Sequence, residues 1–373
     1  MSRRLGVAEA IVDGRRIPGD VALADGAVAE VGLLPLGAGT AIAGLVDLQV
    51  NGFGGVDLLS ADDAGWAQAG EALLRTGVTS YLPTLITAPA ETTTAALARA
   101  DRLMRRGDPG PPGARILGVH LEGPFISPKR LGVHPPEHRR DPDPALLDRL
   151  LAAGPVAMVT LAPELPGAEQ LLDRLLERGI VVSVGHSAAP AEVAAAAFRR
   201  GARAVTHLFN AMEPLRARDP GVVGAALVDE RVAALCIVDG VHLAEENVRL
   251  IFGRRRGTAV LTSDAIAPAC TGSGDFTLAG EPISVSDGRA TRSDGTLAGS
   301  VAPMVGAIPR LVDLGVPLEE AVTAATAAPA RLLGRANLGS IAPGARADLV
   351  VLDDSLVPAA VFQAGRLVAE GAG

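Results

Sequence analysis

The chain has 373 residues, with 34 Lys plus Arg against 42 Asp plus Glu, which leaves a formal net charge of −8. This acidic balance argues against a nucleic-acid-binding protein, while 48% apolar residues can fill the core of a large α/β domain with a small annex. We find no apolar stretch long enough for a membrane helix and expect neither membrane association nor an export signal. Only two cysteines occur, which favours a reduced, cytoplasmic location.

Short β-strands are predicted at both ends of the chain. Turn-forming dipeptides separate short apolar runs there: Asp13-Gly14, Asp25-Gly26 and Ala364-Gly365. Such dipeptides favour the tight turns of β-hairpins. We therefore predict that residues 1–43 and 338–373 together form one small β-sandwich domain.

Between these ends, residues 44–337 alternate apolar, β-rich runs with amphipathic helical runs. This alternation is typical of parallel strands joined by helical crossovers. After a first unit that begins at Leu45, strands are predicted over residues 78–82, 116–121, 156–161, 180–184, 204–207, 232–238 and 258–262. About eight strand–helix units fit an α/β fold of the closed (β/α)₈ TIM-like barrel type. A doubly wound open sheet is the main alternative, but the Gly-x-Gly-x-x-Gly turn typical of it is missing.

Ionisable side chains fall at the carboxyl ends of the predicted strands: Glu122, His186, His207, His242 and Asp264. In a closed barrel these ends converge on the face that carries the active site, so the five groups are expected to meet. Glu122, His186 and His207 form a suitable ligand set for a catalytic divalent ion that keeps one position open for water. Asp264 is suited to accept a proton from that water, although it could instead cap a following helix.

Six motifs follow one another along the chain: GLVDLQVNG at 44–52, HLEGPF at 120–125, GHS at 185–187, THLFNAM at 206–212, DGVH at 239–242 and SDA at 263–265. In order and spacing they resemble the N-acetylglucosamine-6-phosphate deacetylases of the amidohydrolase superfamily. The segment from Leu338 to Leu349 also resembles the tail common to amidohydrolases. One of these motifs alone would be weak, whereas six in order make a specific match.

The resemblance implies roles for further residues and agrees with the metal ligands assigned above. Asp264 would be the general base and later the general acid of the reaction. His134 would polarise the acetamide carbonyl, and His242 would hold the sugar. The loop at Asn210 and Ala211 would supply backbone contacts to the substrate phosphate.

Two features concern the subunit arrangement and the number of metal ions. Arg218 matches an arginine that reaches the phosphate from the neighbouring subunit, so the resemblance implies a homodimer. Many amidohydrolases carry His-x-His after the first barrel strand, where this chain has Gln49-Val50-Asn51. Carboxamides are weaker ligands than imidazole for a borderline-soft ion, so we expect one divalent ion per chain, Zn²⁺, and no strong second site.

The expected activity is hydrolysis of the acetamide of N-acetylglucosamine 6-phosphate to glucosamine 6-phosphate and acetate. A metal-activated water would attack, with Asp264 as base and acid. The alternatives are a deacetylase of N-acetylgalactosamine 6-phosphate, an amidohydrolase acting on a cyclic amide, and a barrel that binds sugar phosphates without catalysis. The complete set of metal ligands plus base argues against the last, because a binding module needs neither.

Overall fold

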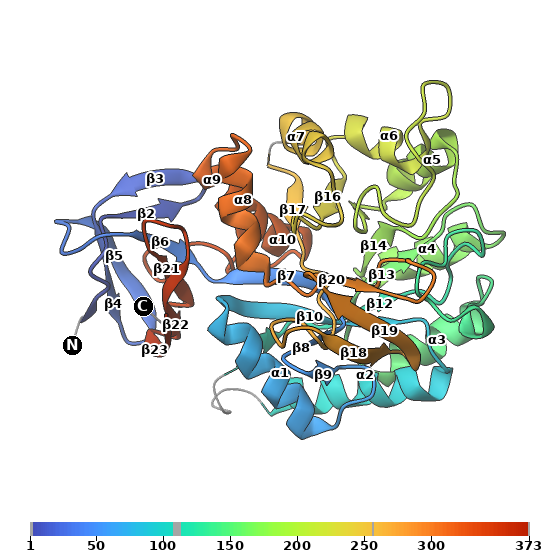
Figure 1. Ribbon diagram of the computed structural model, residues 1–373, viewed down its shortest axis with the longest axis horizontal. Coiled ribbons are helices and arrows are strands. Elements are labelled where there is room, and N and C mark those ends of the chain that lie inside the picture. The colour runs from blue at the N-terminus through green and yellow to red at the C-terminus, as the bar shows by residue number, and fades with distance from the viewer. Residues whose placement is uncertain (1–2, 107–112, 256, 372–373) are drawn as a thin grey trace.

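Parallel strands form the wall of a barrel, and this confirms the predicted fold class (Figure 1). The computed structural model describes residues 3–106, 113–255 and 257–371. In pairing order the eight wall strands found there are β7 (Leu45–Val50), β10 (Val78–Ile86), β12 (Val119–Glu122), β13 (Val156–Leu161), β14 (Val181–Val184), β15 (Ala204–Val205), β16 (Ala233–Cys236) and β17 (Ala259–Leu261). A single parallel bridge from Val50 to Ala265 links the two ends of this wall.

Helices cover the outside of the barrel. Those between successive wall strands are α1 (Asp63–Arg75), α2 (Ala90–Arg105), α3 (Pro144–Ala153), α4 (Ala168–Glu177), α5 (Ala191–Arg200), α6 (Gly221–Val228) and α7 (Glu245–Arg254). After β17 come α8 (Ala307–Asp313), α9 (Leu318–Ala325) and α10 (Ala327–Leu332), and the short 3₁₀ turns are η1 (Pro136–His138) and η2 (Met304–Gly306). None of the helices in the described part of the chain is long and apolar enough to cross a membrane.

In several of the helices that cover the barrel, apolar residues recur with the helical period. In α4, Leu171, Leu172 and Leu175 are buried, while the polar residues between them face outward. Helix α6 was not predicted, because its sequence GVVGAALV is apolar on every side and therefore has no such period. The predicted strand over residues 116–121 is interrupted at Gly118, whose φ of 135° separates β11 (Arg115–Ile116) from β12.

Strands from both termini share the smaller β unit on the left of Figure 1. One sheet has the order β23 (Arg366–Glu370), β22 (Pro358–Gln363), β21 (Leu349–Leu352), β6 (Thr40–Ala43), β2 (Glu9–Val12) and β3 (Arg15–Pro18). The other contains β1 (Arg3–Arg4), β4 (Asp20–Ala24) and β5 (Ala27–Leu33). At the predicted turns Asp13, Asp25 and Ala364 have φ of 48°, 52° and 47°, each followed by a glycine that also has positive φ, as tight hairpin turns require.

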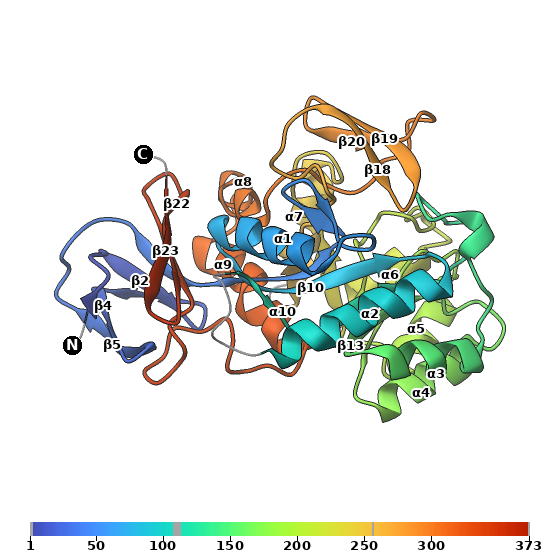
Figure 2. The ribbon, with the colours of Figure 1, turned by 90° about the horizontal axis from the view of Figure 1, so that it is seen from below.

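A three-stranded antiparallel sheet that the sequence did not predict is inserted after β17. It consists of β18 (Gly274–Leu278), β19 (Glu281–Ser286) and β20 (Arg289–Thr291), and Figure 2 shows it standing out from the barrel. Buried side chains of the insert, among them Leu278 and Ile283, pack against Ile86 and Ile266. The insert therefore covers the barrel face at which the strands end. Elsewhere, a two-stranded ribbon, β8 (Gly52–Phe53) with β9 (Val56–Asp57), follows the first barrel strand.

Candidate active site

The five ionisable residues predicted at strand ends lie together. Glu122 is the last residue of β12, while His186 and His207 follow β14 and β15 by two residues. Asp264 comes shortly after β17, and His242 lies in the loop after β16. All five line one pocket of about 360 Å³ at the carboxyl ends of the barrel strands. The barrel has thus brought together groups that are up to 142 residues apart in the sequence.

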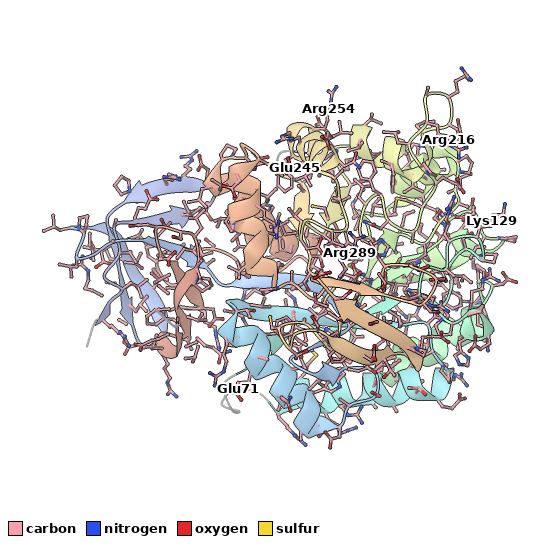
Figure 3. The ribbon with its side chains drawn as sticks, in the orientation of Figure 1. Glu71, Lys129, Arg216, Glu245, Arg254 and Arg289 are labelled. Atoms are coloured by element: carbon pink, nitrogen blue, oxygen red, sulfur yellow. The ribbon has the colours of Figure 1, made fainter. Side chains whose placement is uncertain are left out.

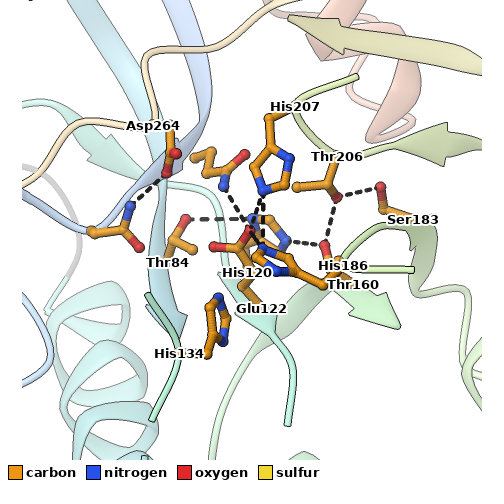
Figure 4. A network of polar contacts seen from close by, with 12 residues as sticks. Thr84, His120, Glu122, His134, Thr160, Ser183, His186, Thr206, His207 and Asp264 are labelled. Atoms are coloured by element: carbon orange, nitrogen blue, oxygen red, sulfur yellow. Dashed lines mark hydrogen bonds and ion pairs between the residues drawn. The ribbon is translucent and has the colours of Figure 1, made fainter. Parts of the chain in front are cut away.

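Three of these side chains aim their donor atoms at one point (Figure 4). Glu122 Oε1 lies 3.0 Å from His207 Nε2 and 3.2 Å from His186 Nε2, and the two imidazole nitrogens are 3.1 Å apart. All three side chains are buried. Ligands that share one Zn²⁺ at about 2.0–2.2 Å have separations of this order.

The hydrogen bonds of His186 test whether this trio suits a metal ion. Its Nδ1 lies 2.8 Å from the carbonyl oxygen of Arg130, which can only accept, so Nδ1 must carry the proton. In the neutral ring Nε2 then presents a lone pair toward Glu122 and His207. A lone pair beside a carboxylate oxygen is repulsive unless a cation lies between them, and a carbonyl partner that orients a ligating imidazole is typical of metal sites. The donor set therefore fits a divalent ion.

Gln49 and Asn51, which stand where many amidohydrolases have histidines, act as hydrogen-bond donors. Gln49 Nε2 donates to Glu122 Oε1 at 3.0 Å, and Asn51 Nδ2 donates to Asp264 Oδ1 at 2.8 Å. Both side chains are buried. The two carboxamides thus orient a candidate metal ligand and the expected base. Sequence reasoning identified these residues only as poor ligands and missed that role.

Asp264 faces the pocket from a turn in which its φ is 50°. Burial and the nearby charge of Glu122 raise the pKa of Asp264 to about 7. The alternative that Asp264 caps the start of a helix is wrong, since the next elements after β17 are the strands of the insert and the next helical turn along the chain, η2, begins only at Met304. The Asp264 side chain therefore lines the pocket and does not cap a helix.

His134 lies between β12 and α3 and packs against His186, with their ring centroids 4.3 Å apart. The backbone N–H of Thr87 donates to His134 Nδ1 at 3.3 Å, and the Thr87 hydroxyl lies 2.8 Å from the same nitrogen. Nδ1 is therefore an acceptor, and burial lowers the pKa of His134 well below its usual value. The neutral ring carries its proton on Nε2 and can donate a hydrogen bond to a ligand in the pocket.

A chain of buried polar side chains that sequence reasoning missed lies beside Glu122, His186 and His207 (Figure 4). His120 Nδ1 donates to the carbonyl oxygen of Leu48 at 3.2 Å, and His120 Nε2 lies 2.7 Å from the hydroxyl of Thr160. The Thr206 hydroxyl lies 2.7 Å from that of Thr160 and 2.6 Å from that of Ser183. Burial lowers the pKa of His120 to about 4, so the ring is neutral. The period-two spacing of His120 and Glu122 on one strand was a signal that could have identified this residue.

The pocket lining includes groups that could bind a phosphate. Asn210 and Ala211 line it; the N–H of Asn210 is engaged by the carbonyl oxygen of His207 at 2.9 Å, but its buried side-chain nitrogen has no partner among the described residues. Lys129 also lines the pocket, and so does Arg130, which forms an ion pair with Glu213. Sequence analysis could not place these two cations, because the direction of a loop is not a periodic property.

Arg218 does not line the pocket within one chain. It is exposed in the loop before α6, where Figure 3 shows the neighbouring Arg216 at the outer end, pointing away from the barrel. This placement is compatible with a contact to another molecule. It gives Arg218 no contact with the pocket of its own chain.

The chain is similar in sequence and in structure to known proteins. The model of the amidohydrolase family matches residues 40–368. The human N-acetylglucosamine-6-phosphate deacetylase is 40% identical, over 87% of this chain and 82% of its own length. An N-acetylgalactosamine-6-phosphate deacetylase from Escherichia coli O157:H7 is 37% identical over 98% of both chains. A mutant N-acetyl-D-glucosamine-6-phosphate deacetylase from Mycobacterium smegmatis, solved in complex with N-acetyl-D-glucosamine 6-phosphate, superposes with a TM-score of 0.93 at 36% identity and covers 99% of each chain.

Proposed function

The chain belongs to the amidohydrolase family, and on that premise we propose that it is a metal-dependent deacetylase of N-acetylglucosamine 6-phosphate. The products are glucosamine 6-phosphate and acetate, which places the protein in amino-sugar metabolism. The observation that carries this proposal is the buried trio of Glu122, His186 and His207 with Asp264 in the same pocket. A site that only binds a sugar phosphate has no need of metal ligands plus a base.

The metal ligands in this proposal are Glu122, His186 and His207, and the ion is Zn²⁺. Two imidazoles and one carboxylate, with a remaining open position, form a typical catalytic zinc set. An ion bound there supplies a more acidic water and polarises a carbonyl oxygen. Gln49 and the carbonyl oxygen of Arg130 hold Glu122 and His186 in orientation.

The other steps belong to side chains of this chain. Asp264, oriented by Asn51, accepts a proton from the attacking water and later returns it to the departing amine. His134, with its proton on Nε2, donates a hydrogen bond to the amide oxygen as negative charge develops there. His242 holds the sugar, and the side-chain amide of Asn210 with the backbone of Ala211 contacts the phosphate.

An acetate-release assay on purified, Zn²⁺-loaded protein tests this function. We expect acetate from N-acetylglucosamine 6-phosphate at a rate well above that from the unphosphorylated sugar. A cyclic amide such as a hydantoin is the matched control, and its ring opening without acetate release from any sugar would favour the cyclic-amide alternative. Binding of the sugar phosphate without turnover would favour a non-catalytic barrel.

The galacto epimer is a second candidate substrate, because the relative from Escherichia coli O157:H7 is named for it and matches 98% of the chain. The two epimers differ only in the direction of one hydroxyl, so a pocket that recognises the acetamide and the phosphate accepts both to some extent. Parallel measurement of kcat/KM for the two epimers decides between them. A higher value for the galacto epimer would reassign the substrate.

We also propose that the protein is a homodimer and that Arg218 completes the phosphate site of the neighbouring subunit. The exposure of Arg218 on an outward loop, beside the exposed Leu215, supports this arrangement. A guanidinium matches phosphate geometry, and a hydrogen bond to a charged group typically contributes about 1.5–3 kcal/mol. The change Arg218→Ala should therefore raise KM for the phosphorylated sugar roughly ten- to a hundredfold and leave activity on the free sugar nearly unchanged.

Two controls make the Arg218 test specific. Arg216→Ala removes a neighbouring exposed cation, and Lys129→Ala tests whether the required charge comes from the same chain. In a mixed dimer of Asp264→Asn and Arg218→Ala chains, one site keeps both groups, so mixing should restore part of the activity. Full activity in a monomer, or equal effects on both sugars, would contradict the proposal.

We propose domain boundaries near residues 43 and 338, supported by the end of β6 at Ala43 and the start of β7 at Leu45. We propose a cytoplasmic location, in keeping with the free thiols of Cys236 and Cys270.

A further inference from the structure

A buried carboxylate holds the ring of His242. Asp239, three residues earlier in the loop after β16, has its Oδ2 2.8 Å from His242 Nδ1. The two side chains are only 6% and 4% exposed. Hydrogen bonds from His242 outweigh the effect of burial and hold the pKa of Asp239 below its usual value, so the group is a carboxylate that can only accept.

Both oxygens of Asp239 are saturated by donors. Oδ1 accepts the backbone N–H groups of Val241 at 2.8 Å and His242 at 2.9 Å. Oδ2 accepts the hydroxyl of Ser300 at 2.9 Å in addition to the imidazole. Because four donors surround it, this carboxylate has one orientation. His242 must therefore carry a proton on Nδ1, and the nitrogen left for the pocket is Nε2.

Ser300 joins this pair to the turn that carries the expected base. Its backbone N–H donates to the carbonyl oxygen of Asp264 at 2.9 Å, and its own carbonyl oxygen accepts the N–H of Ile266 at 3.1 Å. The preceding Gly299 has φ of 81°, and a Cβ there would lie 2.8 Å from the Asp264 carbonyl oxygen. The segment after β20 thus ties the Asp239–His242 pair to the backbone of Asp264.

We propose that Asp239 is a positioning residue that sets the tautomer of His242, so that Nε2 accepts a hydrogen bond from a sugar hydroxyl, and that Ser300 keeps this pair in register with Asp264. The inference rests on the proposed function, in which His242 holds the sugar. The contact with Asp239 explains why the His242 imidazole presents an acceptor to the substrate. A carboxylate that holds one tautomer of an active-site histidine is a general device in enzymes.

Asp239→Asn is the most informative variant, since the amide cannot satisfy all four donors. The two backbone N–H groups require an oxygen, so the carbonyl oxygen of the new side chain takes the place of Oδ1 and its NH₂ group faces His242 Nδ1. The imidazole must then accept at Nδ1 and carry its proton on Nε2. The sugar hydroxyl, which faces an acceptor at Nε2 in the parent protein, would then face a donor.

Nitrogen-15 NMR of histidine-labelled, Zn²⁺-loaded protein detects the tautomer of His242 directly, because protonated and unprotonated ring nitrogens have very different chemical shifts. The chain has six histidines, and the signal that disappears in His242→Gln identifies His242. We expect an Nδ1–H tautomer in the parent protein and an Nε2–H tautomer in Asp239→Asn. This measurement does not depend on catalysis, so it separates the inference from the proposed function.

Kinetics give the second readout. Asp239→Asn should raise KM for the sugar phosphate at least about tenfold, with a smaller change in kcat, because the lost hydrogen bond holds the sugar equally in the ground state and the transition state. Ser300→Ala, which removes one donor, should shift KM in the same direction by less and serves if the first variant does not fold. Asp57→Asn is the matched control, because Asp57 also accepts a backbone N–H and a serine hydroxyl but lies outside the pocket.

An Nδ1–H tautomer at His242 in Asp239→Asn, or parent KM values in both the Asp239 and the Ser300 variants, would overturn the inference. Parent kinetics in His242→Gln would instead remove His242 from the proposed substrate site. The tautomer measurement would still decide what Asp239 does.

Discussion

Replacement of Asp264 by asparagine is expected to lower the turnover of acetate release at least about 100-fold and to leave the metal content unchanged. The Asp264 carboxylate faces the pocket, and Asn51 orients it from 2.8 Å. An amide of the same shape keeps that contact but cannot accept a proton from water. Turnover and metal content measured on the same preparation test this expectation. Near-normal turnover would remove Asp264 from the mechanism.

The same variant should be more stable than the parent in the metal-free state above pH 7. The pKa of Asp264 is raised from 3.8 to about 7, so the folded protein opposes its ionisation. The stability from the protonated group is fully present below the unfolded pKa and is lost as pH rises through about 7. Ionisation therefore costs at most on the order of 4 kcal/mol at pH 8, a cost that the neutral amide of the variant would not carry.

Thermal melting of both metal-free proteins between pH 4 and pH 8 measures this difference. The melting temperature of Asp264→Asn should exceed that of the parent at pH 8, and the gap should narrow toward pH 4. A variant that loses turnover but gains stability has lost a functional group and not a structural one. A uniform loss of stability at every pH would contradict a raised pKa.

Glu122→Gln is expected to abolish stoichiometric metal binding and, with it, acetate release. Glu122 supplies the only negative charge of the trio, with Oε1 facing His186, His207 and the amide of Gln49. A neutral amide oxygen is a much weaker ligand for Zn²⁺. Loss of an outer partner of a metal site typically costs about 10–100-fold in affinity, so loss of a ligand should cost at least about 100-fold.

Metal analysis and Zn²⁺ titration measure this effect. The parent chain should bind one ion tightly, since Gln49 and Asn51 donate hydrogen bonds to Glu122 and Asp264 and have no imidazole to offer a second ion. Asp57→Asn, away from the pocket, should keep parent affinity. Two stoichiometric ions in the parent, or unchanged affinity in Glu122→Gln, would contradict the proposed site.

The alternation of short apolar runs with amphipathic runs was sufficient to predict much of the barrel. The predicted strand over residues 156–161 corresponds to β13 (Val156–Leu161), and the amphipathic run that follows it forms α4 (Ala168–Glu177), because apolar period and length differ between strands and amphipathic helices. The insert β18–β20 was missed. Its sequence has short exposed strands, and what fixes them is packing against Ile86 and Ile266 of the barrel.

The side chains that could meet were evident from the order of residues along the chain. Parallel strands end on one face of a barrel, so Glu122, His186, His207 and Asp264 were identifiable as soon as they were seen to follow apolar strands. The motifs in the chain resembled the family to which its sequence relatives belong. Neither inference required knowledge of a single contact.

How those side chains are held depends instead on contacts between distant segments of the folded chain. The bond from Gln49 to Glu122 joins residues 73 positions apart, and that from Asn51 to Asp264 joins residues 213 apart. The proton on Nδ1 of His186 depends on the carbonyl oxygen of Arg130, which belongs to a loop with no periodic signal. Hydrogen bonds have a short range and a strict direction, so donor, acceptor and tautomer are determined only when the folded backbone brings distant segments within about 3 Å.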